Sequence, residues 1–120
     1  MKLLIGNEKD IKNNLIDRIE IENKTYIVHY YQKNVCVFDS KCPHAQGSLL
    51  SASYENEYII CPSHGIKFNL KDGKANIDDV KDDFKNSIIK KGIENIALCF
   101  LHTENEYGLI YLYTNESKIY

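Results

Sequence analysis

The sequence lacks the features that mark several common classes of protein. Its formal net charge is only −2 at pH 7, which excludes a strong general attraction to nucleic acid or to anionic lipid. No run approaches the roughly 18 consecutive apolar residues of a membrane-spanning helix. Repeats, low-complexity linkers and composition shifts are also missing. We therefore expect one globular domain over residues 1–120, without a nucleic-acid or membrane partner.

A secretion signal is also missing at the start of the chain. The apolar residues Leu3 to Ile5 are followed directly by polar ones from Asn7, and three residues are too few for the hydrophobic part of a signal peptide. This predicts a soluble, cytoplasmic protein. In a reducing compartment, the four cysteines are expected to be metal ligands or buried thiols rather than two disulfides.

Most of the chain is predicted to form short strands, because segments that alternate charged and apolar residues, as at 18–22, or are rich in Tyr, Ile and Val, as at 25–31, are separated by turn residues. Asp72-Gly73 favours a tight hairpin, and further hairpin turns are expected at 32–34 and at 103–108. Regular short strands of this kind favour an antiparallel β-sandwich or a small barrel. The expected strands are residues 18–22, 25–31, 34–38, 57–60, 66–70, 74–77, 96–102 and 109–114.

One segment, residues 77–91, has helical periodicity instead. Its apolar residues fall three or four positions apart and so share one face; they are Ile77, Val80, Phe84 and Ile88. Asn76 can cap the helix start, and Lys90-Lys91-Gly92 ends it. The pattern predicts one short amphipathic helix that packs on a sheet.

The chemistry is concentrated in two short motifs. Cys42-Pro43-His44 is followed, after sixteen residues, by Cys61-Pro62-Ser63-His64-Gly65. Thiolate and imidazole ligands suit iron–sulfur clusters and zinc, and they do not suit magnesium or calcium. In zinc sites, the first two ligands are usually separated by two to four residues, whereas only Pro43 separates Cys42 from His44. A two-iron cluster explains this spacing more easily, with Cys42 and Cys61 on one iron and His44 and His64 on the other.

The segment from Cys42 to Phe68 resembles the cluster-binding region of the Rieske family, whose two loops carry Cys-x-His and Cys-x-x-His. Further matches to residues frequent around those loops are Pro43, Gly47, Pro62 and Gly65. The resemblance implies an all-β fold, a three-sheet antiparallel β-sandwich with a cluster-binding subdomain at about residues 40–70. It also implies one [2Fe–2S] cluster. Glycine at 47 and 65 would let backbone amides approach the sulfurs.

Departures from the family pattern indicate a low reduction potential. High-potential members have an extra cysteine in each loop, joined as a disulfide, where this chain has Gly47 and Ser63. They also donate hydrogen bonds to the sulfurs from Ser and Tyr hydroxyls at positions that are Ile66 and Phe68 here. We therefore expect a potential towards the low end of the roughly −150 to +300 mV Rieske span. Members usually cover the cluster with a later proline-containing loop, which the 77–91 helix is expected to replace.

These residues predict a one-electron carrier. It would be a ferredoxin or a small electron-transfer subunit of a multicomponent oxidoreductase of the oxygenase or nitrite reductase type. Its partners would be a reductase and an oxygenase or other terminal acceptor, docking near residues 43–46 and 62–66. Catalysis by the chain alone is not expected, because only His29 and His102 remain for a second iron site and no nucleophile or nucleotide motif occurs.

Two alternatives stay open, a zinc-stabilised interaction module without a redox role and a sensor of redox state or iron. Cys36 and Cys99 are predicted to be buried strand residues, and a disulfide between them stays open as well. His29 is expected to be structural or at the surface, and His102 solvated.

Overall fold

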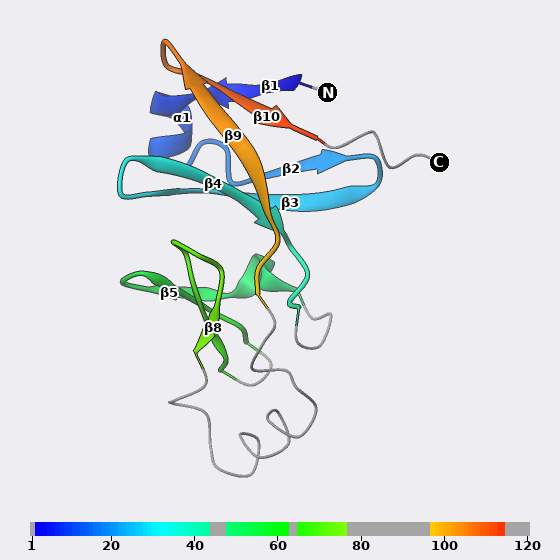
Figure 1. Cartoon of the computed structure of the whole chain (residues 1–120), viewed down its shortest axis with the longest axis vertical. Helices are drawn as coiled ribbons and strands as arrows, with labels where there is room; N and C mark the ends of the chain where they lie inside the picture. Colours follow the sequence, from blue (N-terminus) through cyan, green and yellow to red (C-terminus); the bar gives the residue numbers. More distant parts are fainter. Residues whose placement is uncertain (1, 44–47, 63–64, 77–96, 115–120) are drawn as a thin grey trace. The chain divides into compact units, whose positions relative to one another are not determined.

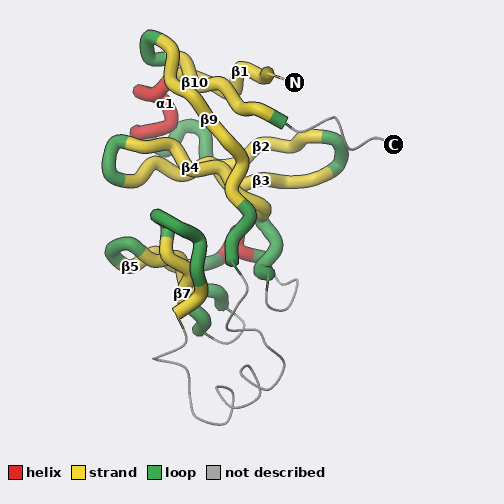
Figure 2. The backbone as a smooth tube through the Cα atoms, viewed as in Figure 1, coloured by secondary structure: helices red, strands yellow, loops and turns green. Residues whose placement is uncertain are grey.

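The computed structural model describes residues 2–43, 48–62, 65–76 and 97–114. The chain divides into two compact units. We call Met1–Asp39 with Phe100–Tyr120 the six-stranded unit, and Ser40–Cys99 the four-stranded unit, after the sheet that each contains. Both sheets are antiparallel (Figures 1 and 2).

The six-stranded sheet has the order β1-β10-β9-β4-β3-β2. Its strands are β1 (Lys2–Asn7), β2 (Arg18–Ile21), β3 (Lys24–Tyr31), β4 (Asn34–Asp39), β9 (Phe100–Glu106) and β10 (Leu109–Tyr113). Strand β9 joins the set β1-β10-β9 to the set β4-β3-β2, because it pairs with β10 over residues 102–106 and with β4 at Phe100 and Leu101. These two sets and the four-stranded sheet together confirm the expected three-sheet β architecture.

Tight turns connect neighbouring strands, as predicted for β3 and β4. Gln32 and Lys33 both have positive φ, the backbone that matches the twist of a two-residue hairpin. The last hairpin differs from the prediction, because β9 continues to Glu106 and only Tyr107–Gly108 form the turn. The polar residues of β9 misled the prediction, since polar side chains are tolerated on the solvated face of an antiparallel sheet.

A short helix that the sequence analysis missed follows β1. Helix α1 (Glu8–Lys12) begins at Asn7, whose side-chain oxygen accepts a hydrogen bond from the Asp10 amide at 2.8 Å. This N-cap satisfies one of the amides left without a partner in the first turn. With five residues, α1 is too short to show a helical period. It is held by burial of Ile11.

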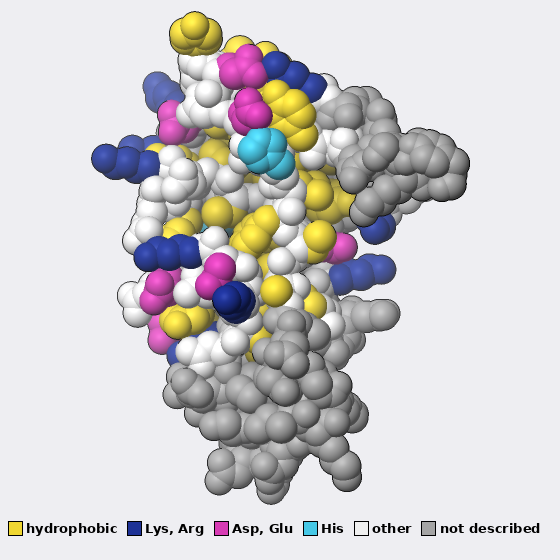
Figure 3. Space-filling model, in the orientation of Figure 1, with side chains coloured by type: hydrophobic (Ala, Val, Ile, Leu, Met, Phe, Trp, Pro, Cys, Tyr) yellow, Lys and Arg dark blue, Asp and Glu magenta, His cyan; other side chains and the backbone are white. Residues whose placement is uncertain are grey.

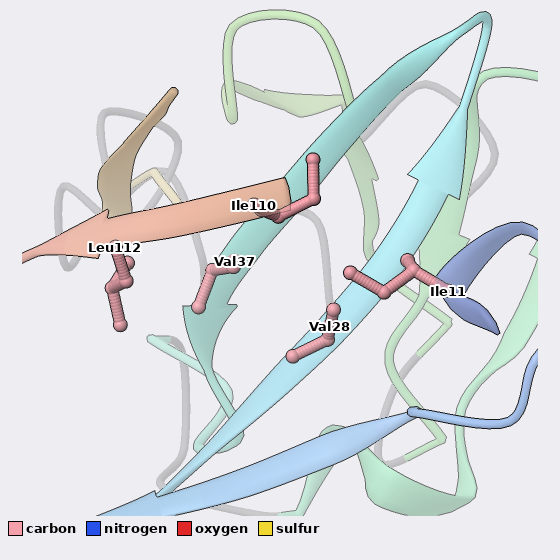
Figure 4. Close-up of a cluster of buried hydrophobic side chains, with 5 residues drawn as sticks. All are labelled: Ile11, Val28, Val37, Ile110 and Leu112. Carbon is pink, nitrogen blue, oxygen red and sulfur yellow. The ribbon is translucent and has the colours of Figure 1, made fainter. Parts of the chain in front are cut away.

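The core of the six-stranded unit joins α1 to three strands. Five buried side chains form it, shown in Figure 4: Ile11, Val28, Val37, Ile110 and Leu112. Burying each such side chain stabilises the fold by roughly 1.5–3 kcal/mol. Val28 and Val37 lie directly opposite each other on β3 and β4, and the next pair, Ile27 and Phe38, is buried as well.

The four-stranded sheet has the order β5-β6-β7-β8. Its strands are β5 (Ser53–Glu55), β6 (Tyr58–Ile60), β7 (Lys67–Asn69) and β8 (Ala75–Asn76). The hairpin predicted across Asp72-Gly73 is confirmed, with Phe68 opposite Ala75. Strand β5 was not predicted, because its three residues are all exposed and give no apolar alternation.

The predicted helix over residues 77–91 lies outside the described residues. In the part of the chain that the structure describes, no helix has the length and apolar character needed to cross a membrane.

Candidate metal centre

The second cysteine motif and the segment that leads into β5 leave the four-stranded sheet at the same end. Ser53, Ile60, Lys67 and Asn76 form one row across it, because each pairs with the next. Strand β5 begins in this row, β6 ends in it and β7 begins in it again. The segments before β5 and between β6 and β7 therefore leave the sheet at this end. We call Lys41–Ser48 the first loop, Cys61–Ile66 the second loop, and this edge of the sheet the loop end.

The second loop is closed by its own backbone. The Cys61 amide donates to the Ile66 carbonyl at 2.9 Å, and the Gly65 amide donates to the Cys61 carbonyl at 3.0 Å. Gly65 has φ of +74°, a left-handed conformation that favours glycine. The glycine therefore serves the tight return of the chain. Its own amide donates within the loop.

The first loop is closed where it meets the rest of the unit. Lys41 and Ser48 form an isolated antiparallel bridge, and the Leu49 amide donates to the Ser40 carbonyl at 2.6 Å. The 3-10 helix η1 (Leu49–Ser51) follows at once, and the Ser48 hydroxyl oxygen accepts from the Leu50 amide at 3.1 Å. Leu49 is buried beneath this turn. Such closure limits the conformations open to Cys42 and Pro43.

Each loop buries its cysteine. Cys42 is 1% exposed and Cys61 is 0% exposed. The other two predicted ligands, His44 and His64, lie outside the described residues. Within the described ranges, no three His, Cys, Asp or Glu side chains come together. Cys42 and Cys61 thus lie buried in two loops of the four-stranded unit, and all four ligand assignments stay predictions.

Buried cysteines in this arrangement fit a [2Fe–2S] cluster. A buried thiolate is unfavourable without a compensating positive charge, and iron supplies that charge. One cysteine per loop is the contribution that a Rieske cluster takes from each of its two loops. A ligand set of two thiolates and two imidazoles also matches the Rieske centre.

The side chains that follow the second loop are apolar and fully buried. Ile66 and Phe68 are both 0% exposed, at the two positions where high-potential Rieske proteins place hydroxyl donors. Phe68 lies opposite Ile59 on β6 and belongs to the buried face of this sheet. These two positions therefore lack a hydroxyl because their side chains are part of the buried apolar interior of the unit.

A charged contact at the base of the second loop was missed in the sequence analysis. Lys67 Nζ lies 3.5 Å from Glu55 Oε1 and 5.9 Å from the centre of the Tyr58 ring. The Tyr58 hydroxyl in turn accepts a hydrogen bond from Asn76 Nδ2 at 3.4 Å. Polar residues flank the buried Phe68 in sequence, and this alternation is the signal that could have placed Lys67 on the opposite face.

The remaining cysteines and histidines lie apart from the two motifs in sequence. His29 and Cys36 are directly opposite on β3 and β4; burial lowers the pKa of His29 and raises the pKa of the Cys36 thiol. His102 is exposed as expected, with Nε2 2.9 Å from Glu104 Oε2. The prediction that Cys99 is buried is wrong, because it is exposed and precedes β9. No disulfide joins any of the four described cysteines.

Solved structures share this fold. One is a chain in the complex of reduced oxygenase and oxidised ferredoxin of carbazole 1,9a-dioxygenase, with 17% identity, a TM-score of 0.67, and 92% of this chain and 91% of that chain covered. The carbazole 1,9a-dioxygenase ferredoxin of Nocardioides aromaticivorans IC177 has 13% identity and a TM-score of 0.67, with 93% of this chain and 96% of that chain covered. A Sphingomonas yanoikuyae B1 ferredoxin has 18% identity and a TM-score of 0.67, with 96% of this chain and 100% of that chain covered. At these identities the likeness establishes the fold.

Sequence comparison identifies the family. No curated protein matches the chain at a significant level. The family model of the Rieske [2Fe-2S] domain, however, matches residues 1–86. This range is more than half of the 120 residues and contains both cysteine motifs. It favours one [2Fe–2S] cluster over the zinc alternative. The chain belongs to the Rieske [2Fe-2S] domain family.

Proposed function

We propose that this protein is a one-electron carrier that works as a ferredoxin or as a small electron-transfer subunit of a multicomponent oxidoreductase. In this proposal, Cys42 and Cys61 bind one iron of the cluster, and His44 and His64 bind the other. The observation that carries it is the burial of Cys42 and Cys61 in two loops of one small unit, the four-stranded unit. When bound, a [2Fe–2S] cluster accepts and releases a single electron.

The chain's own residues prepare this site in three ways. Burial of the two cysteines excludes water from the sulfur side. The backbone bonds that close the second loop fix the direction in which Cys61 enters it. Ile66 and Phe68 are buried apolar residues that offer no hydroxyl donor. This favours a low reduction potential, because hydrogen bonds to the sulfurs stabilise the reduced, more negative state of the cluster.

Redox proteins are the proposed partners, namely a reductase and an oxygenase or other terminal acceptor. The likeness to carbazole 1,9a-dioxygenase ferredoxins, one of them in complex with its oxygenase, supports this. We propose that residues 1–120 form a single Rieske domain, with the cluster-binding region at about 40–70. A cytoplasmic location is also part of the proposal, because an exposed thiol such as that of Cys99 persists best in a reducing compartment.

Metal analysis of protein purified without oxygen tests the function. About two irons and two sulfides per chain are expected, with a low-average-g EPR signal after reduction. Cys42→Ser and Cys61→Ser should each lose the cluster. Cys99→Ser is the matched control, since it removes an exposed thiol and should keep full iron and sulfide. A colourless protein with one zinc would overturn the proposal.

Substitution of a proposed nitrogen ligand tests the assignment more closely. His64→Cys should retain some cluster with a lower potential, because a thiolate adds negative charge where a neutral imidazole was. His102→Cys, outside both motifs, should leave the potential unchanged. An unchanged spectrum and potential in His64→Cys would show that His64 is not a ligand.

A further inference from the structure

Strand β2 is the last described strand on its side of the six-stranded sheet, and it pairs with β3 over its whole length. The Val28 amide on β3 donates to the carbonyl of Asp17, directly before β2, at 3.0 Å. In an antiparallel strand, residues whose backbone bonds to one neighbour alternate with residues whose backbone faces the other side. The backbone groups of Ile19 therefore face β3, and those of Arg18 and Glu20 point away from it. Edge backbone of this kind can pair with another strand.

The two residues whose backbone points outward carry opposite charges. Arg18 and Glu20 are both exposed, and they share one face of the strand because they are two positions apart. Neither makes an ion pair or a side-chain hydrogen bond within the described residues. Arg18 is the only arginine among the 15 basic residues of the chain. A guanidinium can bind a carboxylate through two parallel hydrogen bonds, which a lysine ammonium does not match.

The opposite edge of this sheet differs in both respects. Its edge strand β1 carries Lys2, whose Nζ lies 2.8 Å from Glu106 Oε2 of β9 in the same chain. Figure 3 shows acidic and basic side chains interspersed over β9 and β10. The register of β1 with β10 shifts between Leu4 and Gly6, and such an irregularity discourages pairing with a further strand. Strand β2 has no shift in its pairing with β3.

One antiparallel pairing of two β2 strands satisfies both backbone and charge. Residues that face outward must lie opposite each other, and a pairing centred on Ile19 places Arg18 of each copy opposite Glu20 of the other. Each such pair would form two backbone hydrogen bonds. A pairing centred on Arg18 or on Glu20 puts that residue opposite itself, which brings like charges together. A pairing centred on Ile21 puts Glu20 opposite Glu22, with the same result.

The pairing centred on Ile19 also covers apolar surface. Ile19 and Ile21 are half-buried and pack against the core on the other face of the strand. At the centre, Ile19 of one copy would face Ile19 of the other at a position without backbone bonds, where opposite side chains come closest. Because a two-fold interface uses every contact twice, one Arg–Glu pair in the sequence gives two in the dimer.

We propose that β2 is the interface of a weak, reversible homodimer. The β2 strands of two copies pair antiparallel about Ile19, and Arg18 of each copy binds Glu20 of the other. The two six-stranded sheets then form one continuous sheet. The dimer is weak because exposed ion pairs contribute little and association costs translational and rotational freedom. This inference goes beyond the electron-carrier function and does not depend on it.

Sedimentation equilibrium of the oxidised holoprotein measures the dimer. As the concentration rises from about 10 μM to 1 mM, the average mass should rise from that of one chain towards that of two. Raising the salt concentration from about 50 to 500 mM should weaken the dimer several-fold, because salt screens exposed ion pairs. The mass of a single chain over the whole concentration range would overturn the proposal.

Charge reversal tests the Arg–Glu pairs. Arg18→Glu and Glu20→Arg should each weaken the homodimer about tenfold or more, because two attractive pairs become repulsive. An equimolar mixture of the two variants should associate again, since each glutamate then faces an arginine. Lys33→Glu is the matched control, because it makes the same charge change in the exposed β3–β4 turn and should leave the dimer unchanged. Equal dimerisation of Arg18→Glu and the wild type would overturn the proposed interface.

The double variant Arg18→Glu/Glu20→Arg tests the register. It has the composition and net charge of the wild type, and opposite charges still face each other in a pairing centred on Ile19. The double variant should therefore dimerise as tightly as the wild type. A pairing centred on Glu20, with Arg18 opposite Glu22, would instead acquire a pair of glutamates opposite each other and weaken. A monomeric double variant would show that the pairing about Ile19 is wrong.

Amide hydrogen exchange followed by NMR reports on the backbone alone. The Arg18 and Glu20 amides should exchange more slowly at about 1 mM than at about 50 μM protein, because they bond only across the dimer. The Ile19 amide faces β3 and should be protected equally at both concentrations, which makes it an internal reference. Equal exchange of the Arg18 and Glu20 amides at the two concentrations would contradict the proposal.

Discussion

Ile60 and Lys67 lie directly opposite each other on β6 and β7, as the last pair before the chain leaves the sheet at Cys61. This pairing fixes the second loop at the six residues from Cys61 to Ile66. A shift of one residue in register would move Phe68 from the buried face of the sheet to the exposed one. Burial of Phe68 and the position of Cys61 are therefore set by the same strand pairing.

Restoring a hydroxyl beside the site should raise the reduction potential. Phe68→Tyr adds a donor at the position where high-potential family members have one. If the new hydrogen bond favours the reduced state by about 1 kcal/mol, the potential rises by about 40 mV. Potentiometric titration followed by EPR measures this. Phe100→Tyr adds the same hydroxyl to the six-stranded unit and should not change the potential; an equal rise in both variants would contradict the explanation.

Substitution of Gly65 should destabilise the protein through its backbone alone. A Cβ at this position meets no atom within 4 Å, so the cost comes from φ of +74° and should be about 1–2 kcal/mol for Gly65→Ala. Denaturant unfolding measures it. Gly108→Ala is matched in both respects, with φ of +87° and open space around the Cβ. It should cost a similar amount but leave iron retention unchanged, whereas Gly65→Ala should also lower iron retention.

Acid should destabilise the fold partly through His29. Burial holds its pKa below 6.5, so the unfolded chain takes up this proton at higher pH than the folded protein does. The stability that depends on neutral His29 is therefore present above pH of about 6.5 and is lost as pH falls towards the lower folded pKa. His29→Gln should lose less stability than the wild type between about pH 7.5 and 5, measured by thermal unfolding. His102→Gln serves as the exposed control, and equal losses in wild type and His29→Gln would refute the prediction.

Thiol labelling of the holoprotein should distinguish the two cysteines outside the motifs. The thiolate is the reactive form, and burial raises the pKa of Cys36, whereas Cys99 is exposed. We expect one fast-reacting thiol per chain with a maleimide, located at Cys99 by mass spectrometry of the labelled peptide. Cys99→Ser should abolish the fast phase. A fast phase that persists in this variant would show that Cys36 is accessible.

Sequence patterns predicted β3 and β4 because both segments are rich in β-branched and aromatic residues, whereas the six-residue strand β1 was not predicted. Val28 and Val37 are buried, and so are their neighbours Ile27 and Phe38, so neither strand has a strict period of two. Strand β5 and helix α1 were missed because three and five residues are too few to show any period. The end of β9 was placed too early because Glu104 and Glu106 are charged. Charged side chains on the solvent-facing side of a strand do not prevent the strand from pairing.

At the site, the sequence predicted the residues whose spacing along the chain identifies their chemistry. It did not predict features that depend on packing in three dimensions. The two cysteine motifs predicted the loops that bury Cys42 and Cys61. Cys99 was predicted to be buried because its neighbours Leu98 and Phe100 are apolar, but β9 starts only after it. The contact between Lys67 and Glu55 depends on the side-by-side pairing of β5, β6 and β7. Strands this short did not allow that pairing to be predicted from sequence.

The connection between the two units has a consequence for how such a molecule can be altered. The chain leaves the six-stranded unit after Asp39 and re-enters it at Phe100, and Phe100 pairs with Phe38. Exit and entry are therefore adjacent on neighbouring strands, which is the arrangement that tolerates insertion of one folded segment within another. A short turn from β4 to β9 could replace the whole four-stranded unit, and a different cofactor-binding segment could be grafted at the same junction.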